Sequence, residues 1–223
     1  MKTKLSKRIQ IRLIVRPPKW FRLFSGPTIW RIETEEKKLF LTFDDGPIPE
    51  LTPWVLDTLD EYSAKATFFC VGDNVRKHPE IFAQLRERGH GVGNHSYSHK
   101  NGFRTSIQSY NRDVYKARRH IDSKLFRPPY GRLRGLSRRL LKTRYKIILW
   151  DVLSMDYDKS LDARQVVRNV IGNVKPGSIF VFHDNLKAVK NLEYALPRIL
   201  DYYSKRGYSF VNLESELLLN RKQ

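Results

Sequence analysis

Short apolar runs alternate with segments of helical periodicity from residue 39 to residue 211, and no other feature of the sequence constrains the fold as strongly. We expect strands at residues 39–43, 66–71, 91–94, 125–127, 147–150, 178–182 and 208–211. Between the third and fourth of them, apolar residues from Ile107 to Ile121 recur at steps of three and four, which is typical of an amphipathic helix. Strand followed by helix, repeated about seven times, predicts an α/β fold with a parallel sheet and right-handed crossovers.

Two of the expected helices have boundaries that the sequence specifies. Thr52 is expected to cap a helix whose first residue is Pro53, because proline suits the first helical position. Pro197 is expected to interrupt the last helix, which spans Leu192 to Ser204.

Polar residues follow the expected strands, at the place where reactive side chains gather in parallel α/β folds. They are Asp44 and Asp45 after the first strand, His95 and His99 after the third, Arg127 at the end of the fourth, Asp151 and Asp156 after the fifth, and His183 and Asp184 after the sixth. A single histidine is more often a surface or core residue. The repeated arrival of polar residues at one rim of the sheet instead indicates a site.

The adjacent carboxylates Asp44 and Asp45 have two interpretations. Aspartate and glycine are ordinary turn residues. Alternatively, one carboxylate binds a metal ion with His95 and His99, whose spacing of four puts both on one face of a helix or in a compact loop. The other carboxylate would then take a proton from water, whose pKa a bound cation lowers toward about 7. His183 can supply the proton that a leaving group needs.

Other sites built on acidic residues fit the sequence less well. An aspartyl-phosphate phosphatase uses two aspartates separated by one residue, whereas these are adjacent. A calcium loop needs oxygen ligands at alternate positions, and the chain has no glycine-rich phosphate loop.

The positive charge of the chain is concentrated in two blocks. The formal net charge is +19, of which residues 1–38 carry +8 and residues 100–146 carry +13, whereas the remainder carries −2. Such blocks attract anionic partners or form a solvated basic surface. We expect contact with an anionic glycan or a membrane surface; nucleic acid, which is also anionic, is not an expected partner.

Cysteine usage and the N-terminal segment bear on the compartment. Cys70 is the only cysteine, so no intrachain disulfide forms, and its apolar neighbours predict a buried thiol. The apolar stretch from Leu13 to Val15 is shorter than a signal-peptide core, and no run approaches the roughly 18 apolar residues of a membrane span. We expect a cytoplasmic or peripheral-membrane protein, with residues 16–32 on a membrane surface or packed over the bottom of the domain.

Five stretches of the chain resemble the motifs of the polysaccharide deacetylase family, carbohydrate esterases that remove N-acetyl groups from amino sugars. TFDDGP, HSYSH and RPPYG match the first three motifs in order, and FVFHD resembles the fifth with Val181 in place of the usual leucine. WDVLSMDYD resembles the fourth motif, but it has Leu153 and Tyr157 where the family has aspartate and tryptophan. The resemblance covers residues 38 to 213.

The resemblance implies a single-domain, distorted seven-stranded (β/α) barrel of the TIM-barrel type at residues 38–215, with a basic extension at 1–37 and a tail at 216–223. It also implies roles for the motif residues. These are Asp44 as catalytic base, Asp45, His95 and His99 as metal ligands, Arg127 as the partner that orients Asp44, His183 as general acid, Asp156 as the carboxylate that tunes it, and the backbone N–H of Tyr130 as oxyanion donor. Tyr157, Pro128, Pro129 and Gly131 are expected to frame the substrate pocket. The metal of the family is commonly Zn²⁺, and Co²⁺, Mn²⁺ or Ni²⁺ can serve.

Three hypotheses about function follow. The first is a metal-dependent hydrolase that removes N-acetyl groups from the N-acetylhexosamine units of a glycan, such as peptidoglycan or a chitooligosaccharide. A variant of it is a deacylase or deformylase of a lipid-linked amino sugar, which the basic N-terminal segment favours. The third, from another class, is a non-catalytic module that binds an anionic polymer through residues 100–146.

Overall fold

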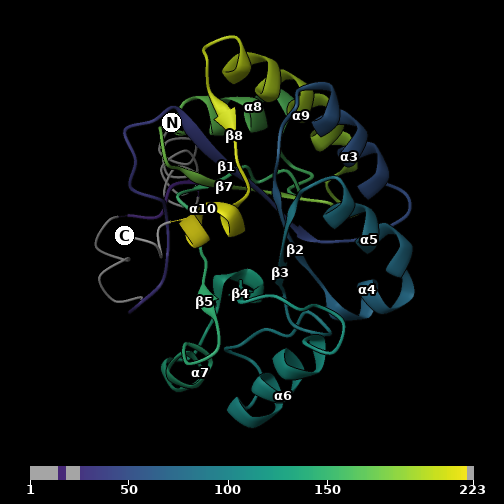
Figure 1. The fold of residues 1–223 in the computed structure, drawn as a ribbon, viewed down its shortest axis with the longest axis vertical. Helices are drawn as coiled ribbons and strands as arrows, with labels where there is room; N and C mark the ends of the chain where they lie inside the picture. The colour runs from purple at the N-terminus through teal and green to yellow at the C-terminus, as the bar shows by residue number, and fades with distance from the viewer. Residues whose placement is uncertain (1–14, 19–25, 220–223) are drawn as a thin grey trace.

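The computed structural model describes residues 15–18 and 26–219 (Figure 1). The strands are β1 (Lys38–Asp45), β2 (Thr67–Cys70), β3 (Gly91–Asn94), β4 (Leu125–Phe126), β5 (Lys146–Ile147), β6 (Val152–Leu153), β7 (Ile179–His183) and β8 (Ser209–Phe210). The helices are α3 (Thr52–Glu61), α4 (Gly72–Lys77), α5 (Pro79–Glu87), α6 (Ile107–Ala117), α7 (Gly135–Leu141), α8 (Ala163–Ile171), α9 (Val189–Ser204) and α10 (Leu213–Leu219), with the short 3₁₀ turn η1 (Pro129–Gly131).

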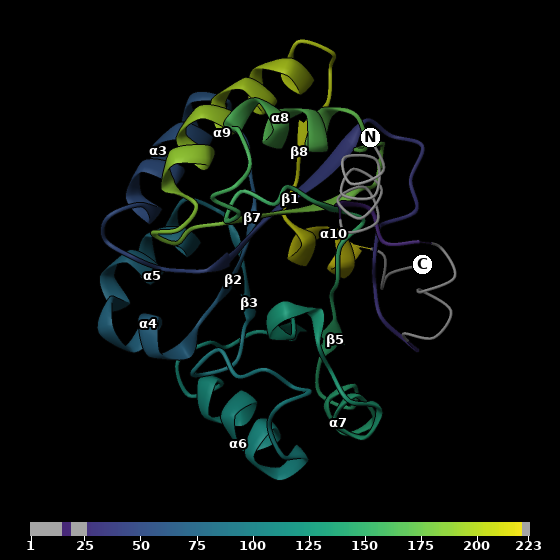
Figure 2. The ribbon, with the colours of Figure 1, turned by 180° about the vertical axis from the view of Figure 1, so that it is seen from behind.

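The strands form one curled, parallel sheet surrounded by helices (Figures 1 and 2). Its strand order is β5-β4-β3-β2-β1-β7-β6, and β8 pairs in parallel with the first residues of β1. Helices α3, α4 and α5 lie along one side of the sheet, whereas α8 and α9 lie at one end of the view and α6 and α7 at the other. The predicted α/β barrel is therefore confirmed.

One segment, residues 146–153, connects the two edges of the curled sheet. It starts beside β4, where the Ile148 N–H donates to the Phe126 carbonyl at 2.9 Å. It then crosses to β7, where the Asp151 N–H donates to the Ile179 carbonyl at 2.8 Å. The sequence predicted one strand here, and the structure has β5 and β6 because the segment changes its pairing partner midway.

Residues 29–32 lie in the seam where that crossing occurs. Ile29 forms a parallel bridge with Ile148, and Arg31 forms an antiparallel bridge with Ser178. Part of the expected N-terminal extension is thus hydrogen-bonded to the sheet. The predicted domain boundaries themselves stay a prediction. Residues 19–25 of the segment expected on a membrane surface lie outside the described residues.

Side chains of β1 alternate between the helices and the barrel interior. Leu41 and Phe43 belong to the hydrophobic cluster that includes the apolar faces of α3, α8 and α9. Phe40 instead packs in a second cluster with Phe69, to which α10 contributes Leu213 from below. The same alternation sends the side chain of Asp44, which is 4% exposed, into the upper interior of the barrel.

Two helix predictions were wrong in detail. Helix α3 begins at Thr52 and has no side-chain cap, because the Thr52 hydroxyl oxygen accepts from the Ile48 N–H at 2.9 Å while its hydrogen is donated to the buried Asp184 carboxylate at 2.7 Å. Helix α9 continues through Pro197 because buried neighbours such as Leu196 and Leu200 hold it against the sheet despite the missing N–H. Among the described residues, no helix is both long and apolar enough to span a bilayer.

Candidate active site

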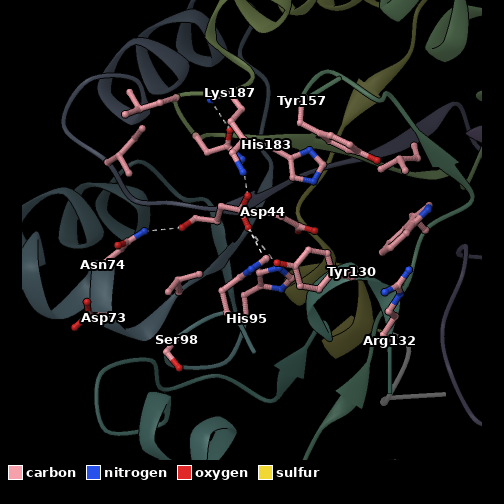
Figure 3. A pocket seen from close by; sticks show the side chains of 18 of the residues that line it. Asp44, Asp73, Asn74, His95, Ser98, Tyr130, Arg132, Tyr157, His183 and Lys187 are labelled. Atoms are coloured by element: carbon pink, nitrogen blue, oxygen red, sulfur yellow. Dashed lines mark hydrogen bonds and ion pairs between the residues drawn. The ribbon is translucent and has the colours of Figure 1, made fainter. Parts of the chain in front are cut away.

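A cavity of about 1040 Å³ opens where the strands end, and it collects most of the polar residues that the sequence singled out (Figure 3). Its lining includes Asp44, Asp45, His95, His99 and His183. These residues come from β1, from the loop after β3 and from the end of β7. The expectation that they meet at one rim of the sheet therefore holds in the structure.

Asp45, His95 and His99 present one ligand atom each within 4.8 Å of one another. Asp45 Oδ1 lies 3.0 Å from Nε2 of His99 and 3.7 Å from Nε2 of His95. This oxygen is buried and has no hydrogen-bond partner of acceptable geometry among the described residues. Nδ1 of His95 lies 2.8 Å from the carbonyl of Arg127, which can only accept, so the Nε2 lone pair faces Asp45.

This donor set fits a divalent metal ion such as zinc, which takes imidazole nitrogen and carboxylate oxygen. Burial lowers the pKa of His95 to about 4, so its ring is neutral at neutral pH, as a ligand must be. Burial alone would raise the pKa of Asp45, but the close contact with His99 and the charge of His183 hold that pKa well below its ordinary value. His95 and Asp45 are therefore in the protonation states that metal binding requires.

Backbone geometry and amide side chains aim the ligands at one point. Asp45 has φ of 90° and His99 has φ of 54°, both in the left-handed region that residues other than glycine rarely adopt. Asn185 donates from its amide to Asp45 Oδ2, and Asn74 donates to the Asp45 carbonyl at 2.8 Å. Asp113 on α6 holds the loop of the two histidines by accepting from three donors there.

The second carboxylate, Asp44, faces an arginine instead of the histidines. Nη1 of Arg127 lies 2.7 Å from Asp44 Oδ1 and 2.8 Å from the hydroxyl of Thr42. The Arg127 side chain is fully buried inside the barrel, where its guanidinium lies 4.1 Å from the centre of the Phe69 ring and also donates to the Leu149 carbonyl. Because these contacts leave the guanidinium in one position, Asp44 is held in one position too.

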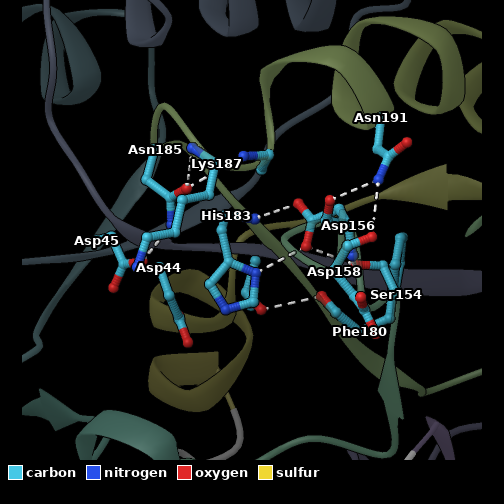
Figure 4. Close-up of polar contacts among 12 residues, drawn as sticks. Asp44, Asp45, Ser154, Asp156, Asp158, Phe180, His183, Asn185, Lys187 and Asn191 are labelled. Atoms are coloured by element: carbon cyan, nitrogen blue, oxygen red, sulfur yellow. Dashed lines mark hydrogen bonds and ion pairs between the residues drawn. The ribbon is translucent and has the colours of Figure 1, made fainter. Parts of the chain in front are cut away.

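His183 is paired with the buried carboxylate of Asp156 (Figure 4). Nδ1 of His183 lies 2.8 Å from Asp156 Oδ1, and the His183 backbone N–H donates to Asp156 Oδ2 at 2.7 Å. Ser154 and Asn191 bind Asp156 in turn, through its carboxylate and its carbonyl. Burial on its own would lower the pKa of His183, but the charge and hydrogen bond of Asp156 raise it to about 9. His183 therefore carries a proton at neutral pH.

The expected pocket-framing residues occupy different places. Tyr157 lines the cavity, with its ring centre 4.8 Å from that of His183 in an edge-on contact. Pro128 and Pro129 are buried below the surface and do not line the cavity. Gly131 lies against Trp150. A Cβ atom at this position would come within 2.8 Å of the indole ring.

Tyr130 sits between these groups and the metal-binding residues. Its φ of 61° is left-handed, and its exposed side chain places its ring centre 4.7 Å from that of His99. The hydrogen bonds of the η1 turn are donated by the N–H groups of Gly131 and Arg132. The N–H of Tyr130 is not used in either of those bonds.

Several residues that shape the site have roles that no sequence motif indicates. Asp184 accepts from the Gly46 N–H at 2.9 Å and from Thr52, which fixes the turn after β1. Asn185 follows it and binds Asp45, and Asp113 holds the histidine loop from a helix. In the sequence, Asp184 and Asn185 could be noticed only as two polar residues that directly follow His183 of the FVFHD motif. No local pattern distinguishes Asp113 from a surface aspartate.

Comparisons with known proteins agree with this geometry. The family model described as polysaccharide deacetylase matches residues 31–145. A peptidoglycan-N-acetylglucosamine deacetylase of Bacillus cereus is 33% identical over 201 residues, which cover 87% of this chain and 94% of the relative. The crystal structure of the Bc1960 peptidoglycan N-acetylglucosamine deacetylase has a TM-score of 0.78 and 30% identity, over 88% of this chain and 95% of that one.

A solved relative without activity is similar as well. The wild-type structure of a CE4 family pseudoenzyme from Bacillus anthracis has a TM-score of 0.75 and 25% identity, over 85% of this chain and 69% of that one. Similarity of fold alone therefore does not establish catalysis. Catalysis by this chain depends on the side chains that line its cavity.

Proposed function

The chain belongs to the polysaccharide deacetylase family, and from this we propose that it hydrolyses the N-acetyl amide of N-acetylhexosamine units in a glycan. It is a hydrolase of carbon–nitrogen bonds other than peptide bonds. The relatives named above act on peptidoglycan N-acetylglucosamine, which supports a substrate of that kind for this chain.

The strongest support for catalysis is that three groups of residues with different chemical roles border one cavity. A metal-binding set, a carboxylate held by a buried arginine and a protonated histidine held by a buried aspartate all border one cavity. A binding module has no need for a base and an acid in fixed positions. Amide hydrolysis needs both, together with a group that stabilises negative charge on the carbonyl oxygen.

In the proposed mechanism Asp44 is the general base and His183 the general acid. Asp44 removes a proton from the attacking water, and Arg127 keeps the carboxylate oriented by its 2.7 Å contact. His183, protonated through its bond to Asp156, gives its proton to the departing amine. Acetate and a free amino sugar are the products.

Asp45, His95 and His99 would hold the metal ion, for which we propose zinc because two imidazoles and a carboxylate suit it. When bound there, the ion would supply Lewis acidity for the acetamide carbonyl and for the attacking water. The Tyr130 ring packs against the His99 ring, and the Tyr130 N–H, which is not used in the η1 turn, is proposed as the second oxyanion donor. Tyr157 is proposed to limit the acyl pocket, because its ring faces His183.

The test of this function is the substitution Asp44→Asn. We expect acetate release from N-acetylglucosamine oligomers and from peptidoglycan fragments to fall by about 100-fold or more, because general-base catalysis contributes roughly that factor. The assay is run with Zn²⁺, Co²⁺, Mn²⁺ or Ni²⁺, and far-ultraviolet circular dichroism verifies folding. Equal turnover by the variant and the wild type would exclude the mechanism.

Asp73→Asn is the matched control for that test. Asp73 lines the same cavity, pairs with Arg76 and Lys77 on α4 and is not among the metal-binding residues. It also accepts from the Tyr97 hydroxyl at 3.0 Å, and asparagine keeps an oxygen that can accept there. Turnover should stay within about twofold of wild type, because exposed ion pairs contribute only about 0–1 kcal/mol. A decrease with Asp73→Asn as large as that with Asp44→Asn would point to a general charge effect instead of a specific base.

A further inference from the structure

Residues 15–18 lie against the cavity although they precede every motif of the family. Val15 is 2% exposed and belongs to the hydrophobic cluster outside the sheet. Pro17 and Pro18 follow it, are half-buried, and line the same cavity as Asp44 and His183. A segment expected to be an extension therefore contributes to the wall of the active site. We call Pro17 and Pro18 the diproline wall.

An ion pair fixes where the diproline wall lies. Nε of Arg16 is 3.7 Å from Oδ1 of Asp151, whose side chain is fully buried. The other oxygen of Asp151 accepts from the Ser178 hydroxyl at 2.7 Å, so the carboxylate has a fixed position. Asp151 directly follows Trp150, which also lines the cavity. The diproline wall consequently stands on the Trp150 side of the cavity.

The size of the cavity calls for a ligand larger than one sugar. Its volume of about 1040 Å³ is at the upper end of the roughly 300–1,000 Å³ of small-molecule sites. Only the acetamide of one sugar has to reach Asp44 and His183, so further space is available for neighbouring sugars. Proline rings are rigid and apolar, and they can pack on the C–H face of a pyranose without losing side-chain freedom.

We propose that the diproline wall, latched by the Arg16–Asp151 ion pair, is a specificity element that contacts a sugar next to the one being deacetylated. This inference rests on the proposed function. Val15 and Arg16 alone would suffice to anchor the segment, whereas the two prolines face the cavity. Contact with a neighbouring sugar strengthens binding of oligomers more than binding of a single N-acetylglucosamine, and it leaves the chemical step alone.

The first experiment replaces the wall with Pro17→Ala together with Pro18→Ala. We expect the KM for the tetramer of N-acetylglucosamine to rise at least fivefold with kcat within twofold, and the rise to be larger for the tetramer than for the monomer. Pro49→Ala is the control, because Pro49 is exposed and does not line the cavity. An unchanged KM for the tetramer, or a fall in kcat with KM unchanged, would overturn the proposal.

The second experiment tests the latch. Arg16→Gln should raise the KM for the tetramer in the same way, and Arg16→Lys should recover part of the loss because it restores a cation opposite Asp151. A purely structural role predicts a lower melting temperature with no change in the balance of KM and kcat. That result for Arg16→Gln would contradict the proposed latch.

A binding measurement separates failure of this inference from failure of the proposed function. The tetramer is titrated calorimetrically into Asp44→Asn protein, with and without the two proline substitutions. A dissociation constant raised at least fivefold by the proline substitutions supports the wall even if no substrate is turned over. If the proline substitutions leave this dissociation constant unchanged, and the protein without any substitution releases acetate, only the proposal for the diproline wall is overturned. If the tetramer does not bind to Asp44→Asn protein at all, both proposals are overturned.

Discussion

At the level of single residues, the two adjacent carboxylates reach one cavity because the backbone departs from strand geometry between them. Successive side chains of a regular strand point to opposite faces. The φ of 90° at Asp45 breaks this alternation, so that Asp44 and Asp45 line the same cavity but meet different partners. Arg127 faces the first, and His95 and His99 face the second.

The pairing of Asp156 with His183 predicts a change in the pH dependence of activity. The charge of Asp156 raises the pKa of His183 to about 9, so the acid form of His183 persists in the wild type up to that pH. Asp156→Asn removes the charge, and the pKa of His183 then falls toward its ordinary value of 6.5. We expect the alkaline limb of the rate profile to move to lower pH by at least one unit.

The measurement is kcat/KM for acetate release from about pH 5 to pH 10, which reports the essential groups of the free enzyme. Asp158→Asn is the matched control, because Asp158 lies on the same segment and its carboxylate is bonded to Ser160. Its alkaline limb should coincide with that of the wild type. If Asp156→Asn left the limb in place, His183 would not be the acid that the profile reports.

Residue types at the site could be predicted, and their supporting contacts could not. Asp44, His95 and His183 were recognisable because they stand in short local motifs at strand ends. Asn185 and Asp113 support the site through contacts with residues far away in the sequence, such as the bond from Asn185 to Asp45. No window of sequence contains both partners of such a contact, so local patterns do not show it.

At the level of elements, the end of β7 holds the turn that follows β1. Asp184 accepts from the Gly46 N–H and the Thr52 hydroxyl, and β7 is paired with β1 along its length. A Cβ atom on Gly46 would lie 1.8 Å from Asp184 Oδ2, which is far inside van der Waals contact. The turn therefore requires glycine for lack of space and not for its conformational freedom.

Gly46→Ala is expected to destabilise the fold by about 1–3 kcal/mol, the usual cost of inserting a methyl group into a packed site. It should also weaken metal binding, because Asp45 directly precedes the turn. Urea unfolding measures the first effect and metal analysis after dialysis the second. Gly135→Ala is the control, since a Cβ atom there meets nothing within 4 Å. Equal stability of Gly46→Ala and wild type would show that the Asp184 contact does not constrain the turn.

His90, just before β3, predicts how stability responds to acid. Its Nδ1 accepts from the Ala66 N–H at 3.2 Å, and its buried Nε2 has no hydrogen-bond partner among the described residues. Burial lowers the pKa of His90 to about 4 from 6.5, so the unfolded chain takes up a proton first as the pH falls. Stability from His90 is complete above pH 6.5 and is lost between 6.5 and 4, by up to about 3 kcal/mol.

His90→Asn keeps an acceptor near the Ala66 N–H and removes the titrating ring. We expect the variant to be less stable than the wild type near pH 7 because the ring packs on Phe68. Its free energy of unfolding should fall less steeply than that of the wild type between pH 6.5 and pH 4. Parallel curves for the two proteins over that interval would refute the assignment.

The strand–helix alternation was sufficient to predict the fold class, and its errors lie where partners change. The stretch at 147–150 reads as one strand because its apolar residues are continuous, yet it pairs with β4 first and β7 later. Thr52 reads as a cap, but its hydroxyl oxygen accepts from the Ile48 N–H and its hydrogen is donated to the buried Asp184 carboxylate. The partners β4, β7 and Asp184 are tertiary contacts, and they are absent from a local window.

At the level of the whole molecule, the basic block at residues 100–146 remains largely exposed and uncompensated. The described carboxylates provide an ion pair for Lys100 and for the buried Arg127, and for none of the exposed cations of the block. Like charges on one surface repel, and salt screens exposed charges over roughly 10 Å at 0.1 M. The block therefore costs stability at low ionic strength.

We expect the melting temperature to rise by a few degrees when NaCl increases from about 20 to 300 mM, because screening relieves this repulsion. Arg118→Gln together with Arg119→Gln should raise the melting temperature at low salt and flatten its dependence on salt, since both arginines are exposed. Scanning calorimetry at constant pH measures both. A melting temperature that falls with added salt would mean that attractive ion pairs outweigh repulsion in this molecule.

The seam between β5 and β7 has a consequence for the order in which the chain acquires its structure during synthesis. Ile29 leaves the ribosome long before Ile148, and Arg31 long before Ser178, so neither can form its bridge until the late strands are made. The segment that contains Ile29 and Arg31 is thus translated early but docks late. A nascent chain arrested before β7 would have an open barrel, with the edge at β1 unpaired and available to other chains.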